Sequence, residues 1–188
     1  MLIIYAHPDK KGHNGFILEK IEQLLKNKKN DYKLLDLYEE DFDPILQSNE
    51  LYTRPESKIS AQVKSWQKLI KENKKIIVIF PNWWNSSPAI LKGFFDKVLT
   101  KDFAFHYIGK RPVGLLKGKA AVIVTTGGPA IYEKLIAKNR ALKTVTKNTL
   151  GFCGLKTKGY MIDNCFEFNQ KQKNKINKKV NQVFKFFN

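Results

Sequence analysis

The stretch FPNWWNSSPAILKGFFDKVL, residues 80–99, decides the fold of this chain. It follows the apolar run KIIVI at residues 75–79, which is typical of a strand buried on both faces of a parallel sheet. The adjacent tryptophans Trp83 and Trp84 come next, and then Pro88, a residue favoured in the first turn of a helix because it has no N–H to leave unpaired. Open α/β folds bind ligands in loops at the carboxyl ends of strands. The stretch therefore predicts a strand, a loop suited to a flat aromatic ligand, and a helix.

Predicted strands and helices alternate along the rest of the chain. Strands are expected at residues 2–6, 32–37, 75–80, 120–125 and 157–162. Apolar spacing predicts helices near residues 17–25, 59–70, 88–99, 132–149 and 169–188. The polar connection of residues 38–57 contains Pro44 and Pro55, so it cannot be one continuous helix. This alternation predicts one α/β domain over residues 1–188, with a five-stranded parallel sheet in the order 2-1-3-4-5 and helices on both faces.

Length and composition narrow the class of protein. A chain of 188 residues is long enough for one well-buried domain and too short for two ordinary ones. It contains no run near the ~20 apolar residues of a membrane span. Residues 1–5 lead directly into a strand, so we expect no targeting segment and a cytoplasmic location. Cys153 and Cys165 lack CxxC spacing and nearby histidines, which favours two reduced, buried thiols over a disulfide or a metal site.

The chain is strongly basic. Its 34 lysines and arginines and 17 acidic residues give a formal net charge of +17, which attracts nucleic acid, anionic membranes and phosphorylated cofactors alike. Residues 169–188 contain six lysines and no acid. The apolar residues of that segment recur at helical spacing: Ile176, Val180, Val183, Phe184 and Phe187. We therefore predict an amphipathic helix with a solvated basic face, and no specific nucleic-acid partner, because no recognition motif is present.

Three loops should converge at one edge of the predicted sheet, because strands one and three are neighbours whose outgoing connections diverge. The loop after strand one, residues 7–14, enters a helix whose free N–H groups and dipole form an anion site. In that loop Asn14 is open to two interpretations, a helix cap or a cofactor contact. Gly127 and Gly128 follow strand four directly, which permits close backbone approach to a ligand.

The segment around residues 80–93 resembles the flavin loop and following helix of the flavodoxin-like NAD(P)H:quinone oxidoreductases. The pattern of that family runs Phe-Pro, a few variable residues with a tryptophan, and then Pro-Ala-(Ile/Leu)-Leu-Lys-Gly. The matching residues here are Phe80, Pro81, Trp84, Pro88, Ala89, Ile90, Leu91, Lys92 and Gly93. Further matches, at His7, Pro8 and Asn14 and at Thr125 to Gly128 with Tyr132, extend the resemblance in the right order to about Gly154.

This resemblance implies a flavodoxin-like three-layer sandwich that holds a flavin between the three loops. The cofactor-binding residues it implies are His7, Gly12, His13, Asn14, Pro81, Asn82, Trp83, Trp84, Asn85, Thr125, Thr126, Gly127, Gly128 and Tyr132. Tyr132 is also the implied catalytic residue, since the family's tyrosine hydroxyl helps to stabilise negative charge on the reduced ring. Lys138 stands where the best-known animal members have a histidine, so we expect no tyrosine-histidine relay.

Four positions depart from the family pattern or stay open. Gly12 replaces a serine, so a phosphate contact there would come from its backbone N–H, and His13 replaces an apolar or aromatic residue. Asn85 replaces an aromatic residue, which implies weaker stacking on the flavin. For Trp83, a place in the core and a place beside the cofactor are both open, whereas Trp84 is predicted as a flavin neighbour.

A further aromatic segment, FAFHY at residues 103–107, is similar to the family segment that reaches the nicotinamide and quinone site of the partner subunit. By that resemblance Phe105 and Tyr107 are substrate-binding residues supplied by a partner chain. The alternative is that they form one face of an extended segment packed on the core. We expect a homodimer, because the predicted helix at residues 88–99 carries more apolar surface than one sheet face needs.

The function that the resemblance implies is hydride transfer from NADPH or NADH, through FMN or FAD, to a quinone or similar acceptor in a ping-pong mechanism. The sequence leaves open which flavin, which nicotinamide and which acceptor are used. An alternative is a flavin-bound ancillary or regulatory subunit of a potassium efflux system, as some relatives are. A third interpretation, a nucleic-acid-binding module, has only the net charge in its favour.

Overall fold

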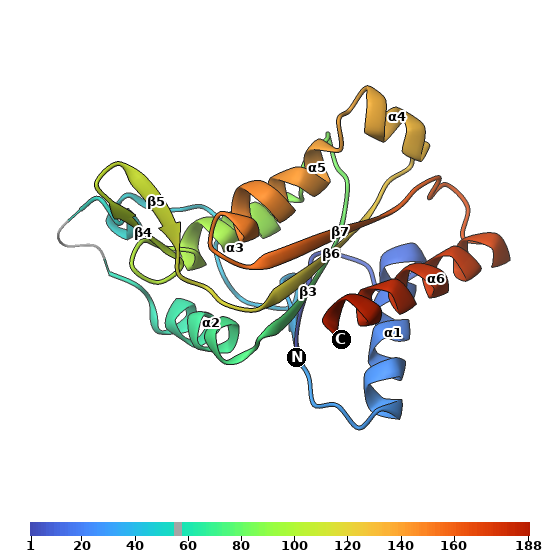
Figure 1. Cartoon of the computed structure of the whole chain (residues 1–188), viewed down its shortest axis with the longest axis horizontal. Coiled ribbons are helices and arrows are strands. Elements are labelled where there is room, and N and C mark those ends of the chain that lie inside the picture. The colour runs from blue at the N-terminus through green and yellow to red at the C-terminus, as the bar shows by residue number, and fades with distance from the viewer. Residues whose placement is uncertain (55–57) are drawn as a thin grey trace.

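Five parallel strands form the central sheet of a three-layer α/β sandwich, and two antiparallel strands form a separate hairpin (Figure 1). The computed structural model describes residues 1–54 and 58–188. The strands are β1 Leu2–Tyr5, β2 Lys33–Asp36, β3 Lys75–Pro81, β4 Phe105–Ile108, β5 Arg111–Gly114, β6 Lys119–Thr125 and β7 Lys156–Ile162. The helices are α1 Gly12–Asn27, η1 Ser48–Glu50, α2 Ala61–Glu72, α3 Ala89–Val98, α4 Ala130–Leu135, α5 Arg140–Lys143, η2 Thr144–Gly151 and α6 Gln170–Phe187. The sheet order β2-β1-β3-β6-β7 confirms the predicted order 2-1-3-4-5.

The central strand β3 is the segment that the opening stretch predicts. All of its residues after Lys75 are buried, because β1 and β6 flank it and helices cover both faces. Its register with β6 pairs Phe80 with Val124 and Pro81 with Thr125. The two strands therefore end side by side, and the loops that follow them begin next to each other.

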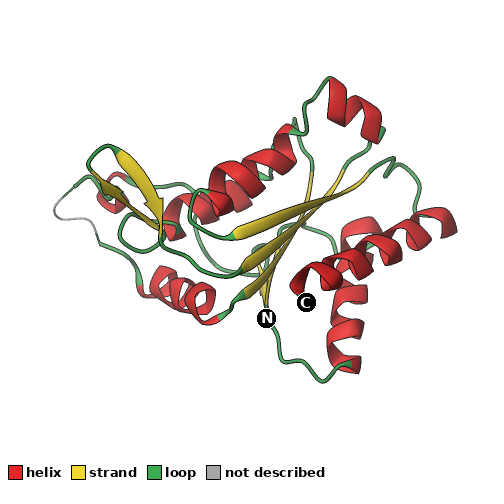
Figure 2. Cartoon of the chain, in the orientation of Figure 1, coloured by secondary structure: helices red, strands yellow, loops and turns green. Residues whose placement is uncertain are grey.

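Helices cover the sheet in two layers, each with its own part of the core (Figure 2). Alternate strand residues such as Ile77 and Ile79 face α1 and α6, while Ile76 and Val78 face α2 and α3. The stripe Ile176, Val180, Val183, Phe184 and Phe187 of α6 is buried. The predicted amphipathic helix at the C-terminus is therefore confirmed, with three of its six lysines exposed to solvent and the other three partly exposed.

Two parts of the chain differ from the prediction. The hairpin β4-β5 was not predicted as a unit. The single helix predicted over residues 132–149 is instead three pieces, α4, α5 and the π-helix η2. The break follows from Lys138 and Asn139, whose φ angles of 56° and 53° lie in the left-handed region that a right-handed helix cannot contain.

The apolar surface of α3 is covered within the chain, contrary to the expectation of a surplus. Leu91, Phe94 and Val98 are fully buried, and the ring of Phe94 lies 5.4 Å from that of Trp66 on α2. Gly93 lets the chain approach closely, since a Cβ there would lie 2.1 Å from the carbonyl oxygen of Pro44. The face of α3 therefore gives no argument for a dimer.

Smaller features of the fold concern the cysteines, the connection after β2, and possible membrane or metal sites. Cys153 and Cys165 are free thiols, the first buried and the second partly buried. In the described part of the connection after β2, the one helical element is the short turn η1, and the predicted breaker Pro55 lies outside the described residues. Over residues 1–54 and 58–188, no helix has the length and apolar character needed to cross a membrane, and no cluster of His, Cys, Asp and Glu could hold a metal ion.

Candidate functional site

The loops after β1, β3 and β6 meet in one hollow of about 340 Å³ at the carboxyl ends of the strands. Its lining consists of His7, Lys11, Gly12, His13, Asn14, Pro81, Asn82, Trp83, Thr125, Thr126, Gly127 and Cys165. Sequence reasoning singled out all of these except Lys11 and Cys165. Four predicted cofactor-binding residues are not part of the lining: Trp84, Asn85, Gly128 and Tyr132.

The first loop brings the N-terminus of α1 to the hollow. The helix begins at Gly12, which has a φ of +74° and no side chain to hinder approach to its N–H. The carboxylate of Asp9 accepts a hydrogen bond from the Lys11 N–H at 2.8 Å, which shapes the turn. Lys10 forms ion pairs with Asp36 and Glu39, so Lys11 is the lysine of this loop that lines the hollow.

Asn14 connects two loops through a buried hydrogen bond and does not cap a helix. The N-cap of α1 is Lys11, and Asn14 lies within the first turn of the helix. Its amide Nδ2 donates to the Thr125 hydroxyl at 2.9 Å, at the end of β6. The cap interpretation is therefore wrong, and the first and third loops are joined directly.

The second loop is a tight turn that presents its tryptophans to solvent. Trp83 and Ser86 exchange two backbone hydrogen bonds of 3.1 and 3.0 Å, while Trp84 and Asn85 between them have φ angles of 54° and 56°. Two successive left-handed residues give the type I′ geometry. Trp84 is fully exposed at the tip, and Trp83 is 41% exposed with its ring 6.1 Å from that of His7. The core interpretation of Trp83 is therefore wrong.

The third loop is fixed by a buried acid that sequence reasoning missed. The Oε1 atom of Glu133, on α4, accepts hydrogen bonds from the Thr126 hydroxyl at 2.6 Å and from Asn82 Nδ2 at 3.1 Å. Only 4% of Glu133 is exposed. One signal was available in the sequence: Glu133 is the only acidic residue between Asp102 and Asp163.

Three atoms in the lining are buried without a hydrogen-bond partner. They are Asn14 Oδ1, Asn82 Oδ1 and His13 Nε2. Burial lowers the pKa of His13, so its ring is neutral at pH 7, and Nε2 can act as an acceptor once the other nitrogen carries the proton. An unpaired buried acceptor costs free energy, so this wall of the hollow is suited to a ligand that donates hydrogen bonds.

Aromatic residues stand around the third loop. The ring of Phe166, 81% exposed, lies 3.2 Å from where a Cβ on Gly127 would be. Tyr132 is 45% exposed, and its ring lies 3.7 Å from the corresponding point on Gly128. The fold therefore places Tyr132 beside the loop, just outside the lining of the hollow.

The predicted substrate residues Phe105 and Tyr107 lie on β4, away from this lining. The Phe105 ring packs edge-on against those of Tyr52, Tyr107 and Phe152, and it lines a separate pocket of about 270 Å³. Tyr107 is half-exposed. Within one chain these aromatic residues therefore pack against each other and do not complete the hollow.

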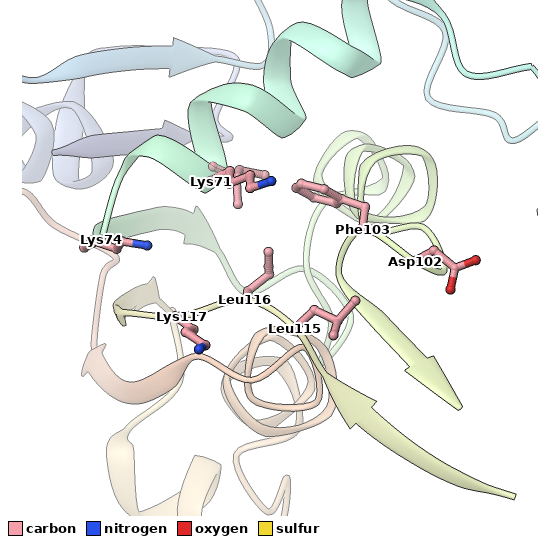
Figure 3. Close-up of a pocket in the computed structure, with 8 residues that line it drawn as sticks. Lys71, Lys74, Asp102, Phe103, Leu115, Leu116 and Lys117 are labelled. Carbon is pink, nitrogen blue, oxygen red and sulfur yellow. The ribbon is translucent and has the colours of Figure 1, made fainter. Parts of the chain in front are cut away.

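A pocket of about 310 Å³ lies at the opposite edge of the sheet, where β3 and β6 begin (Figure 3). Lys71, Lys74 and Lys117 surround its apolar residues, among them Phe103 and Leu116 (Figure 3). None of the residues predicted for the site lines it. Because the three converging loops are at the other end of the strands, we assign the site to the hollow and not to this pocket.

Known proteins share this architecture. The model of a family described as having a flavodoxin-like fold matches residues 1–185. The chain is 32% identical over 157 residues to an uncharacterized NAD(P)H oxidoreductase of Haemophilus influenzae, which covers 82% of this chain and 78% of that protein. It is 32% identical over 178 residues to the human ribosyldihydronicotinamide dehydrogenase [quinone], covering 83% of this chain and 77% of that protein.

Among solved structures, Smu.1420 from Streptococcus mutans UA159 is similar over nearly the whole chain. The two superpose with a TM-score of 0.84 at 30% sequence identity, covering 97% of this chain and 96% of that one. The fold therefore recurs in a solved structure.

The hollow contains a thiol whose reactivity can be predicted. Burial raises the pKa of Cys165 to about 11, so at pH 8 its thiolate fraction is about a hundredfold below that of an exposed cysteine. In a Cys153→Ser variant, which leaves Cys165 as the only thiol, labelling by a disulfide reagent should be slow at pH 8 and accelerate steadily up to pH 11. The unfolded protein in urea is the control. Equal rates for folded and unfolded protein at pH 8 would contradict the assignment.

Proposed function

This chain belongs to the flavodoxin-like NAD(P)H:quinone oxidoreductase family, and on that premise we propose that it is a flavin-dependent enzyme that transfers electrons from NADPH or NADH to a quinone or similar acceptor. A flavin bound in the hollow would supply the redox chemistry, because it accepts a hydride from a reduced nicotinamide and passes the electrons on. The task of the protein is to bind, orient and adjust it. No side chain has to act as a nucleophile.

The observation that carries the proposal is the match between the lining and the polar groups of a flavin. The ribityl hydroxyls and the ring N–H of a flavin are donors, and Asn14, Asn82 and His13 each offer a buried acceptor without a partner. The phosphate of a flavin needs an anion site, which the N-terminus of α1 and Lys11 provide. The hollow therefore offers partners both for the phosphate of a flavin and for its hydrogen-bond donors.

Further residues support the same ligand. Gly127 lines the hollow with its backbone alone, and Trp83 presents a half-exposed aromatic face at the rim. We propose that Trp84, Asn85, Gly128 and Tyr132 complete the site around the bound ring. Reduced thiols such as Cys153 are typical of the cytosol, and we extend the proposal to a cytoplasmic location on that ground.

The first prediction from the proposed function concerns Gly127. Replacing it with valine places a side chain where the flavin ring would approach and where a Cβ already meets the Phe166 ring at 3.2 Å. We expect flavin affinity to fall at least about fivefold, since overpacking costs about 1–3 kcal/mol. Fluorescence titration of flavin-free protein measures the dissociation constant, and Ala130→Val, three residues further on and exposed, is the matched control. If Gly127→Val binds flavin as tightly as the control, the third loop does not contact the ring.

The second prediction concerns turnover. NADPH or NADH should bleach the flavin absorbance of the loaded protein without oxygen, and a simple quinone should restore it. If both substrates use the same flavin face in turn, initial-rate plots at several quinone concentrations give parallel lines.

Tyr132→Phe should slow the bleaching without abolishing it, because one hydrogen bond to a developing charge contributes about 1.5–3 kcal/mol. If neither nucleotide bleaches the flavin, an ancillary role beside a potassium efflux system becomes the better proposal.

The third prediction concerns assembly. We propose that a homodimer brings the hairpin β4-β5 of one chain to the hollow of the other, so that Phe105 and Tyr107 line the substrate site. The exposure of Tyr107 and Ile108, at 47% and 65%, supports this role for the hairpin. Sedimentation velocity at micromolar concentration should show a dimer, and Ile108→Asp should weaken it and lower activity together. A fully active monomer would contradict the proposal.

A further inference from the structure

Glu133 joins three segments of the site through one carboxylate. It is on α4, the Thr126 hydroxyl that it binds is in the loop after β6, and Asn82 is directly after β3. Both hydrogen bonds reach the same oxygen, Oε1, at 2.6 and 3.1 Å. In the part of the chain that the structure describes, no lysine or arginine forms an ion pair with Glu133.

The chemistry of this carboxylate fixes the orientation of its neighbours. An ionised carboxylate has no proton to donate, so both neighbours must turn a donor toward it. Asn82 therefore directs its NH₂ group at Glu133 and its Oδ1 away from it, and this Oδ1 is one of the buried acceptors without a partner. The hydroxyl hydrogen of Thr126 is likewise committed to Glu133. The acid thereby determines that this side of the hollow accepts hydrogen bonds.

The same group places an unpaired negative charge behind the wall of the hollow. Charges interact strongly where water is excluded, since the effective dielectric constant of such sites is about 20 rather than 80. Reduction adds electrons to a bound flavin and therefore adds negative charge. A carboxylate nearby opposes this change.

We propose that Glu133 is a positioning residue with two effects. The length of its side chain lets the carboxylate orient Asn82 and Thr126 for flavin binding, and its charge makes the bound flavin harder to reduce. This inference rests on the proposed function, because it concerns the flavin of that site. The two effects are separable, because one depends on the length of the side chain and the other on its charge.

Two variants separate them. Glu133→Gln keeps the length and removes the charge. Glu133→Asp keeps the charge and shortens the reach by one methylene. Glu72→Gln is the control for net charge, since Glu72 lies at the end of α2, next to the start of β3 and at the far edge of the sheet. For each protein, fluorescence titration gives the dissociation constant of oxidised flavin, and dye equilibration of the holoprotein without oxygen gives the midpoint potential.

We expect Glu133→Gln to bind reduced flavin more tightly relative to oxidised flavin by about tenfold, which raises a two-electron midpoint potential by about 30 mV. For Glu133→Asp we expect oxidised flavin to bind about tenfold more weakly, because hydrogen bonds to the carboxylate are lost, with the potential unchanged. Glu72→Gln should match the unmodified protein in both measurements.

Other outcomes overturn the inference. An unchanged potential in folded Glu133→Gln removes the role of the charge, and unchanged affinity in Glu133→Asp removes the role of the reach. A merely structural role would weaken flavin binding in both variants and shift the potential in neither. If Glu133→Gln does not fold, a potential shift in Glu133→Asp as large as its affinity loss overturns the separation of the two effects. Absence of flavin binding in the unmodified protein would instead contradict the proposed function.

Discussion

The pairing of β3 with β1 on one side and β6 on the other is the constraint on which the site depends. The ladder continues one residue past each strand: the Ala6 N–H donates to the Ile79 carbonyl at 2.9 Å, and the Asn82 N–H donates to the Thr125 carbonyl at 2.7 Å. The three strands therefore stay in register until they leave the sheet. A shift of one residue in either ladder would move the side chains of the strand to the opposite face of the sheet and separate the three loops.

Beyond the sheet, side chains continue the alignment that the backbone begins. Asn14 binds Thr125 across the first and third loops, and Glu133 binds Asn82 and Thr126 across the second and third. These contacts connect all three loops within one chain. A ligand that enters the hollow meets groups already held in place, so little conformational entropy is lost on binding.

The sequence was sufficient for the sheet order and for most of the lining, because both follow from where apolar strands end. It was insufficient where a backbone conformation or a single side-chain contact determines the local structure. The left-handed conformations of Lys138 and Asn139, which divide the predicted helix, have no periodic signal. Glu133 was missed because its isolation among basic residues does not show that it is buried, which depends on its hydrogen-bond partners in the fold. The exposure of Trp83 was undecided because the direction of an aromatic side chain in a loop depends on the turn that carries it.

That turn also bears on how stability and function are balanced in this chain. Trp84 holds a φ of 54°, a conformation that costs a residue with a Cβ about 1–2 kcal/mol and costs glycine almost nothing. Its indole is fully exposed, so no burial within the chain offsets that strain. Folding alone would favour glycine at this position. The tryptophan therefore lowers the stability of the fold at the rim of the site. Such a cost is advantageous only if the indole contacts a molecule other than this chain.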